Sequence, residues 1–260
     1  MNTIFFILIP LFIIVVYFIL RGNIFKSKAI PSLTAEERDL LSKQVHFYQQ
    51  LGAEDKRKFE AKIAAFLGYV RIEGIDLEVN PLDRILVASS AIIPVFGFDD
   101  WKYKNLSSVL LYPDTFNKDF QFEGKERNIL GMVGEGYMNG QMILSRSALQ
   151  RGFSNAAGKE NTAIHEFVHL LDKSDGATDG VPDNLMKHEY TVPWVKMIHQ
   201  EMQQIEKGKS DINPYAITNE AEFFAVVSEY FFENPKQLKA KHPQLYQILS
   251  ETFLQDLASK

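Results

Sequence analysis

The sequence predicts an α+β protein, with short strands in the middle of the chain and helices towards both ends. Short β-prone runs follow Gly68, whereas the flanking segments carry apolar residues at helical spacing. Of the 260 residues, 46% are hydrophobic and 23% are charged, which is the composition of a globular protein with a buried core. The formal net charge of −5 lacks the basic excess that nucleic-acid binding requires, so no nucleic-acid partner is expected.

The chain contains no cysteine. This absence excludes disulfides, a thiol nucleophile and every zinc site that depends on cysteine. Any metal site must therefore be built from histidine, aspartate and glutamate side chains.

Residues 1–20 are predicted to form an N-terminal transmembrane anchor, because they contain no charged residue and are apolar from Ile4 to Leu20. As a helix, this run would rise about 25 Å, close to the roughly 30 Å of a bilayer core. A cleaved signal peptide fits less well, since no basic residue precedes the run and no small-residue cleavage site follows it. A buried core helix is a weaker alternative, because the run lacks a polar stripe.

The basic residues Arg21, Lys26 and Lys28 follow the apolar run. The positive-inside rule therefore predicts a single-pass protein of the inner (cytoplasmic) membrane, with its N-terminus outside and the rest of the chain in the cytosol. Residues 21–33 are expected to be a linker, and residues 34–257 a single domain.

The domain is expected to begin with two amphipathic helices, Leu40–Leu51 and Lys56–Leu67, and Thr34 to Glu37 has the form of a capping box before the first. A largely apolar helix is expected over Leu82–Ile93. Asn139-Gly140 is typical of a two-residue hairpin turn. The β-prone runs predict strands at Val70–Ile72, Ile75–Val79, Ser107–Tyr112 and Gln141–Ser145. From about Asn161 the pattern is helical almost to the end, with loops near 173–192 and 207–217.

His165-Glu166-Phe167-Val168-His169 is the strongest functional signal in the chain. In a helix, residues i and i+4 lie on one face about 6 Å apart along the axis, so the two imidazoles can bind one Zn²⁺ ion. Glu166 can then take a proton from a metal-activated water without binding the metal itself. A core helix with two hydrogen-bonded histidines is the competing interpretation.

A catalytic zinc ion needs a third protein ligand, and several carboxylates could supply it. Asp175 follows the motif, but Asp172 stands where a glycine would be needed to break the helix. Asp172 itself shares the face of the two histidines and fits better as a hydrogen-bond acceptor for one imidazole. The remaining candidates lie on a helix expected over 219–233, and the pattern alone does not choose among Glu220, Glu222, Glu229 and Glu233.

Three segments together resemble a known family: HEFVHLLD at 165–172, LYPDTF at 111–116 and INPYAITNEAEFFAVVSEYFF at 212–232. Their order and sequence are similar to those of the Mlc titration factor A family of glucose-regulated zinc metallopeptidases, over roughly residues 30–255. The resemblance implies a zincin-like domain with a small mixed sheet, an active-site helix and a C-terminal helical part. The family's additional upstream histidine has no counterpart, because no histidine lies between His46 and His165.

The resemblance also implies roles for individual residues. Glu222 matches the metal-binding glutamate, so His165, His169 and Glu222 are expected to hold Zn²⁺. Tyr215 matches a tyrosine that in related gluzincins donates to the oxyanion of the tetrahedral intermediate. Glu166 and Tyr215 are therefore the expected catalytic residues.

The expected function is zinc-dependent hydrolysis of peptide bonds in a peptide or protein substrate, by an aminopeptidase or an endopeptidase. An extended substrate is expected to lie on a sheet edge formed by Gln141–Ser145 and its hairpin partner. Family resemblance also supports an alternative, a binding protein that sequesters a transcription repressor and has weak or incidental peptidase activity. A structural zinc site in a protein that is not an enzyme is a third possibility.

Overall fold

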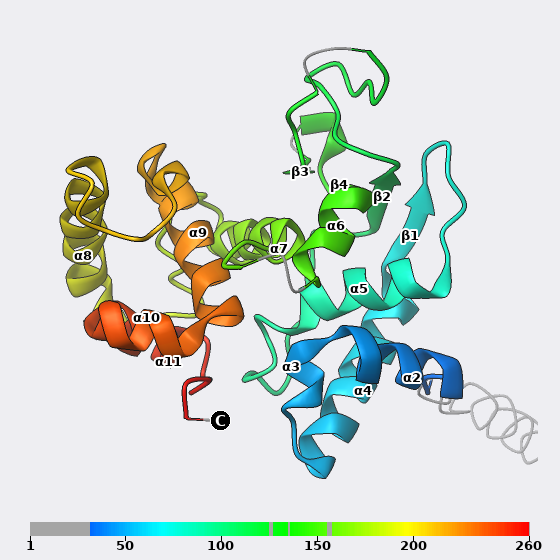
Figure 1. Cartoon of the computed structure of the whole chain (residues 1–260), viewed down its shortest axis with the longest axis horizontal. Coiled ribbons are helices and arrows are strands. Elements are labelled where there is room, and N and C mark those ends of the chain that lie inside the picture. Colours follow the sequence, from blue (N-terminus) through cyan, green and yellow to red (C-terminus); the bar gives the residue numbers. More distant parts are fainter. Residues whose placement is uncertain (1–31, 125–126, 135, 155–157, 260) are drawn as a thin grey trace, which may run out of the picture. The chain divides into compact units, whose positions relative to one another are not determined.

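The computed structural model describes residues 32–124, 127–134, 136–154 and 158–259, which form an α+β domain (Figure 1). The expected transmembrane anchor and almost all of the linker fall on residues 1–31, outside the described residues. Within the described residues, no helix is both long enough and apolar enough to cross a membrane.

The sheet has four strands in the order β1-β2-β4-β3. The strands β1 (Arg71–Gly74), β2 (Ser108–Tyr112) and β4 (Gln141–Ser145) are parallel, and β3 (Gly131–Val133) is antiparallel to β4. The small mixed sheet agrees with the expectation, and β3 forms one of its edges.

The two faces of the sheet contact different apolar clusters, because successive side chains of a strand point to opposite sides. Val109 pairs with Ile72 of β1 and with Met142 of β4, and all three belong to the main core. Leu110 and Ile143 belong instead to a smaller cluster on the other face. The segment between β2 and β3 supplies four of the ten residues of that smaller cluster, so it helps to cover this face of the sheet.

The α-helices pack against the face of the sheet that carries the main core. In chain order the helices are α2 (Ala35–Gln44), α3 (His46–Gln49), α4 (Ala53–Tyr69), α5 (Pro81–Ile92), η1 (Gly136–Met138), α6 (Arg146–Gly152), α7 (Thr162–Asp172), η2 (Lys173–Asp175), α8 (His188–Glu206), η3 (Pro214–Ile217), α9 (Glu220–Glu233), α10 (Pro235–Lys241) and α11 (Pro243–Thr252).

The helix α7 occupies the centre of the domain, with β3 and α5 against it on one side and α9 on the other (Figure 1). Phe167 is fully buried, and its ring centroid lies 5.9 Å from that of Phe66 and 5.2 Å from that of Tyr103. Because the apolar side chains of α7 are held in this core, the helix cannot rotate. The direction of its polar side chains is therefore fixed.

Two sequence-based predictions about the sheet are wrong. Ile75–Val79 is not a strand, because β1 ends at Gly74 and Asp76 adopts a left-handed conformation with φ 51°. A Cβ atom at position 74 would lie 2.2 Å from the Leu77 carbonyl oxygen, so this turn requires glycine.

The expected two-residue turn at Asn139-Gly140 is also wrong. The strands β3 and β4 do form an antiparallel pair, but η1 lies within the connection between them. Gly140, with φ 89°, only completes this longer connection. Since β4 pairs on both sides, the strand at 141–145 is not a sheet edge. The two edges are β1 and β3, and β3 is the one that belongs to this antiparallel pair.

The helical boundaries near the C-terminus differ from the expectation in two places. The helix α8 begins at His188, inside the loop expected near 173–192, and it contains Pro193 early in its course. Pro193 lies beyond the first turn, and because proline has no N–H it costs α8 one backbone hydrogen bond. The loop expected near 207–217 contains the short helix η3.

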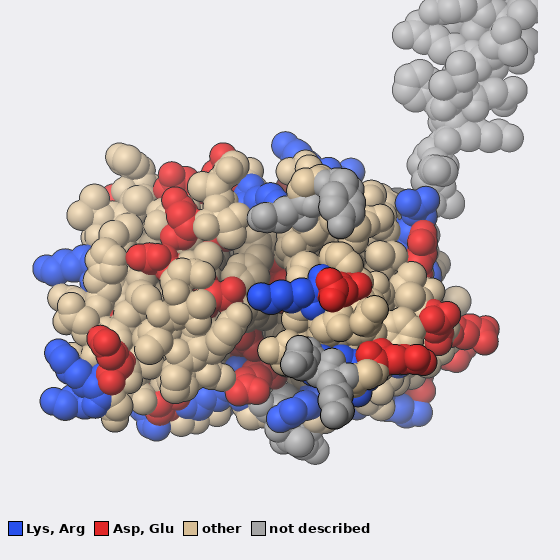
Figure 2. All heavy atoms as spheres, turned by 90° about the horizontal axis from the view of Figure 1, so that it is seen from above, with Lys and Arg blue, Asp and Glu red and all other residues tan. Residues whose placement is uncertain are grey.

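Charge is scattered over the face of the molecule that Figure 2 shows, where Lys and Arg side chains are interspersed with Asp and Glu. The closely spaced ionisable groups lie inside the fold, in two clusters that both involve α9 and the segments beside it. These two clusters are described next.

Candidate active site

The helix α7 places two imidazoles side by side. Asn161 caps the helix, since its side-chain oxygen accepts a hydrogen bond from the backbone N–H of Ile164 at 3.2 Å. One turn separates His165 from His169, and their Nε2 atoms lie 3.1 Å apart. A single cation could therefore contact both rings.

The third member of this cluster comes from the start of α9. Asn219 caps α9 by accepting a hydrogen bond from the backbone N–H of Glu222 at 2.8 Å, which fixes this residue in the first turn. The carboxylate oxygen Oε2 of Glu222 lies 2.9 Å from Nε2 of His165 and 3.5 Å from Nε2 of His169. The possible ligand atoms of these three residues all lie within 4.8 Å of one another, so they could hold a metal ion. We refer to them as the metal-site cluster.

The structure separates the other candidate ligands from this cluster. Asp175 is exposed and accepts hydrogen bonds from the backbone N–H groups of Ala177 and Asp183. Glu220 is also exposed and lies 3.7 Å from His199. Asp172 is buried, and one of its oxygens accepts from the backbone N–H of Gly180 at 2.9 Å.

Glu229 lies behind the metal-site cluster and holds its first imidazole. Oε1 of Glu229 lies 2.7 Å from Nδ1 of His165, and Oε2 accepts from the backbone N–H of Asn161 at 2.5 Å. Sequence reasoning considered Glu229 as a ligand and missed this positioning contact. The sequence feature that could have revealed this contact is the spacing of seven residues, about two helical turns, between Glu222 and Glu229. This spacing places both carboxylates on one face of α9.

The electrostatics of the cluster favour a positive charge. Burial alone would lower the pKa of His165, but hydrogen bonds to Glu222 and Glu229 outweigh burial and raise this pKa to about 10. Burial would raise the pKa of Glu222, but its hydrogen bonds to the two imidazoles lower it to about 2. Two imidazoles and one carboxylate are also a ligand set that zinc accepts. The residues present therefore fit a divalent cation.

Glu166 lies in a cleft of 560 Å³ beside the metal-site cluster. The cleft is bordered on one side by all three residues of β3, Gly131–Val133, and Glu166 itself is buried. Burial raises the pKa of the Glu166 carboxyl. A Cβ atom at position 131 would lie 2.7 Å from Cγ of Glu166, so the edge strand approaches this carboxylate as closely as a glycine permits.

Tyr215 borders the same cleft from η3. Its ring centroid lies 6.1 Å from that of His165, and 53% of its surface is exposed. Asn213 caps η3 by accepting from the backbone N–H of Tyr215 at 3.0 Å. Burial, and after it the charges of Glu222 and Glu166, raise the pKa of the Tyr215 hydroxyl, so it stays protonated and able to donate.

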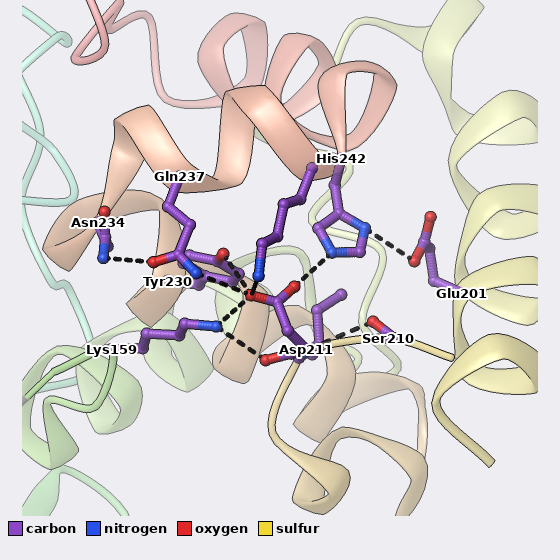
Figure 3. Close-up of polar contacts among 10 residues, drawn as sticks. Lys159, Glu201, Ser210, Asp211, Tyr230, Asn234, Gln237 and His242 are labelled. Carbon is purple, nitrogen blue, oxygen red and sulfur yellow. Dashed lines mark hydrogen bonds and ion pairs between the residues drawn. The ribbon is translucent and has the colours of Figure 1, made fainter. Parts of the chain in front are cut away.

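A second carboxylate cluster holds the chain just before η3 (Figure 3). Both oxygens of Asp211 accept hydrogen bonds, and the partners come from several segments of the chain, two of them from α10. These partners are Lys159, Tyr230, Gln237, Lys241 and His242. Burial alone would raise the pKa of Asp211, but these hydrogen bonds hold it well below its usual range. We call this set the Asp211 cluster. It fixes the segment that leads to Tyr215.

A family model described as glucose-regulated metallo-peptidase M90 matches residues 21–254. The chain belongs to this family. The match contains every residue of the metal-site cluster and of the Asp211 cluster, so the M90 metallopeptidase family covers the whole site described above.

Individual relatives are similar to the chain over most of its length. An uncharacterised protein of Synechocystis sp. is 32% identical over 82% of this chain and 82% of the relative. Mlc titration factor A of Klebsiella pneumoniae is 29% identical over 79% of this chain and 81% of the relative. Mlc titration factor A of Escherichia fergusonii is 30% identical over 69% of this chain and 71% of the relative.

Proposed function

We propose that this protein is a zinc-dependent peptidase whose metal ligands are His165, His169 and Glu222. The observation that carries the proposal is the meeting of these three side chains beside a cleft that also contains the buried carboxylate of Glu166. Membership of a metallopeptidase family supports the same chemistry.

A zinc ion in this position would lower the pKa of a water molecule and polarise the carbonyl of the bond to be cleaved. Glu166 takes a proton from the attacking water and passes it to the leaving amine. The hydroxyl of Tyr215 donates a hydrogen bond to the oxyanion of the tetrahedral intermediate. Glu229 keeps the ring of His165 in the orientation that ligation needs, through the contact at Nδ1.

The edge strand β3 gives the substrate a place to bind. Its three residues border the cleft, and its outer side has no neighbouring strand among the described residues. An extended peptide can add to such an edge through backbone hydrogen bonds. The proposal is that the substrate lies along β3 with its scissile bond over Glu166.

Replacing Glu166 by glutamine tests this mechanism. Glu166→Gln removes the base but leaves the three ligands, so we expect normal zinc content and a loss of peptide hydrolysis of about 10²- to 10⁴-fold. Zinc is measured by metal analysis of the purified protein and activity with a peptide library. Full hydrolysis by this variant would refute Glu166 as the base, and zinc at wild-type level in His165→Ala would refute the ligand assignment.

A second function is supported by the names of the relatives, which are called Mlc titration factor A. We propose that this chain also binds a transcription repressor, independently of hydrolysis. The Glu166→Gln variant separates the two functions, because it can capture a repressor in a pull-down without cleaving it. If neither the wild-type protein nor the variant retains a transcription repressor in the pull-down, the second function is refuted.

The N-terminal segment gives the proposed location. We propose that residues 4–20 anchor the protein in the inner membrane, because their sequence is apolar and uncharged and is followed by basic residues. Protease added to sealed inside-out vesicles should digest the domain that follows the anchor. Digestion from the opposite side of the membrane would reverse the proposed orientation.

A further inference from the structure

A second cavity, of 420 Å³, lies apart from the metal cleft. Its lining is contributed by α3, the ends of α6 and α9, the start of α10, and the C-terminal segment, with Ile164 as its contact with α7. The two linings share no residue among those described. A cavity of this size matches the lower part of the range that small-molecule sites occupy, about 300–1,000 Å³.

About half of the residues that line this cavity are apolar, and the carboxylate of Glu233 stands among them. Phe153, Phe232 and Ile164 provide apolar surface. Glu233 is partly buried, and its Oε1 accepts one hydrogen bond, from the side chain of Asn161 at 2.9 Å. Within the described parts of the chain, no Lys, Arg or His side chain forms an ion pair with this carboxylate.

The surroundings of Glu233 leave its negative charge uncompensated. Burial raises the pKa of its carboxyl to about 7, and the nearby charge of Glu229 adds to this effect while the hydrogen bond from Asn161 opposes it. The basic side chains in the lining, Lys236 and His46, are both exposed, so they lie towards the outside of the cavity.

We propose that this cavity binds a small organic cation, an ammonium group on an aromatic or branched apolar body, with the ammonium group paired to Glu233. An ammonium group supplies both the positive charge and the hydrogen-bond donors that this carboxylate lacks. The apolar body then replaces water along Phe153, Phe232 and Ile164. A carboxylate or phosphate ligand is disfavoured, because it would meet the charge of Glu233 directly.

The cavity is connected to the metal-site cluster through two residues, Asn161 and Glu229. Asn161 donates from its side chain to Glu233 and from its backbone N–H to Glu229. Glu229 in turn contacts Nδ1 of His165. A ligand on Glu233 therefore lies at the end of a continuous set of hydrogen bonds that reaches the proposed zinc ligand.

Three probes with the same phenylethyl body test the proposal: 2-phenylethylamine, the neutral 2-phenylethanol and the anionic 3-phenylpropionate. Each is titrated into the full-length, zinc-saturated protein by calorimetry at about pH 8, where Glu233 is ionised. We expect the amine to bind at least about tenfold more tightly than the alcohol, because a hydrogen bond to a charged group adds that much affinity. Equal affinity for the three probes, or no binding of the amine at millimolar concentration, would overturn the proposal.

Variants locate the binding. Glu233→Gln removes the charge but keeps an oxygen for Asn161, so amine affinity should fall about tenfold, to that of the alcohol. Glu206→Gln makes the same change at an exposed position at the end of α8 and should bind as wild type does. Undiminished amine binding by a folded Glu233→Gln protein would contradict the proposal.

Phe153→Ala provides a test that leaves the carboxylate unchanged. Loss of the aromatic wall should weaken binding of the amine several-fold while its preference over the alcohol remains. This variant, with the probe comparison on the wild type, keeps the proposal falsifiable if Glu233→Gln does not fold. If the amine binds the Phe153→Ala variant and the wild-type protein with equal affinity, then its binding site is not this cavity.

Discussion

The metal-site cluster and the Asp211 cluster use the same kinds of side chain but differ in how their charges are balanced. Glu222 of the metal-site cluster and Glu229 behind it face the imidazole of His165, and Glu166 beside the cluster adds a third carboxylate nearby. No lysine or arginine forms an ion pair with these carboxylates in the described chain. In the Asp211 cluster, one carboxylate accepts from two lysines, a tyrosine, an amide and a histidine.

The difference separates a binding site from a structural one. A set of carboxylates with no lysine or arginine partner among the described residues is stabilised by binding a cation, and its open side is a cleft. A carboxylate whose partners already include two ammonium groups gains nothing from a further ion. The first cluster should therefore respond to mutation mainly in metal binding, and the second mainly in folding stability.

The largest expected effect is on zinc binding when Glu222 is replaced. Glu222→Ala removes one of three protein ligands, so we expect zinc affinity to fall by more than about a hundredfold, beyond the effect of losing an outer contact. Zinc content after dialysis against a weak chelator measures this. Asp211→Asn is the matched control and should retain zinc. If both variants lose zinc equally, the proposed division between the clusters is wrong.

The next effect is on folding. Asp211→Asn removes the charge that Lys159 and Lys241 share, and we expect the free energy of unfolding to fall by about 2 kcal/mol, since the cluster is only partly buried. Urea unfolding followed by circular dichroism measures this. Asp39→Asn, which breaks the single exposed ion pair with Lys43, should cost about 0.5 kcal/mol or less. Similar losses in the two variants would mean that the Asp211 cluster has no special structural role.

A smaller effect is expected when the contact behind His165, the first proposed zinc ligand, is weakened. Glu229→Gln keeps an oxygen for Nδ1 of His165 but removes the negative charge, so zinc affinity should fall by about 10- to 100-fold. Competition with a chromophoric chelator gives the affinity. Glu206→Gln serves as the exposed control. Wild-type affinity in Glu229→Gln would show that the charge of this residue does not support ligation.

The smallest effect is the dependence of stability on pH. The pKa of Asp211 is depressed in the folded protein, so its stabilisation is present above the unfolded value of about 3.9 and is lost as the pH falls towards the folded value. The difference in unfolding free energy between wild type and Asp211→Asn should be constant between about pH 5 and 7 and shrink below about pH 4. A difference that grows on acidification would contradict this assignment.

The sequence predicts well those features that depend on neighbouring residues. The two histidines of α7 lie side by side because four residues of helix separate them, and Gln141–Ser145 is a strand with the predicted bounds. Ile75–Val79 shows the limit of this reasoning. Its alternating pattern is typical of a strand, but the backbone turns at Gly74 and Asp76, so this segment does not continue β1 alongside β2.

Features that join distant segments could not be derived in this way. The meeting of Glu222 with His165 depends on how α9 packs against α7, and helical periodicity does not distinguish Glu222 from the other glutamates of α9. Family resemblance, rather than spacing, selected it. The Asp211 cluster carries no sequence signal at all, since its members are ordinary polar residues on several elements.

Gly131 gives the cleft a steric constraint that a single methyl group would violate. A Cβ atom there would lie 2.8 Å from Oε1 of Glu166, and the acid side chain is the part of that contact able to move. Alanine at this position would therefore displace the carboxylate of Glu166, the proposed base, without removing any polar group from the cleft. Among homologous enzymes that keep Glu166 in this orientation, the residue facing it from β3 should be restricted to glycine, although it has no chemistry of its own.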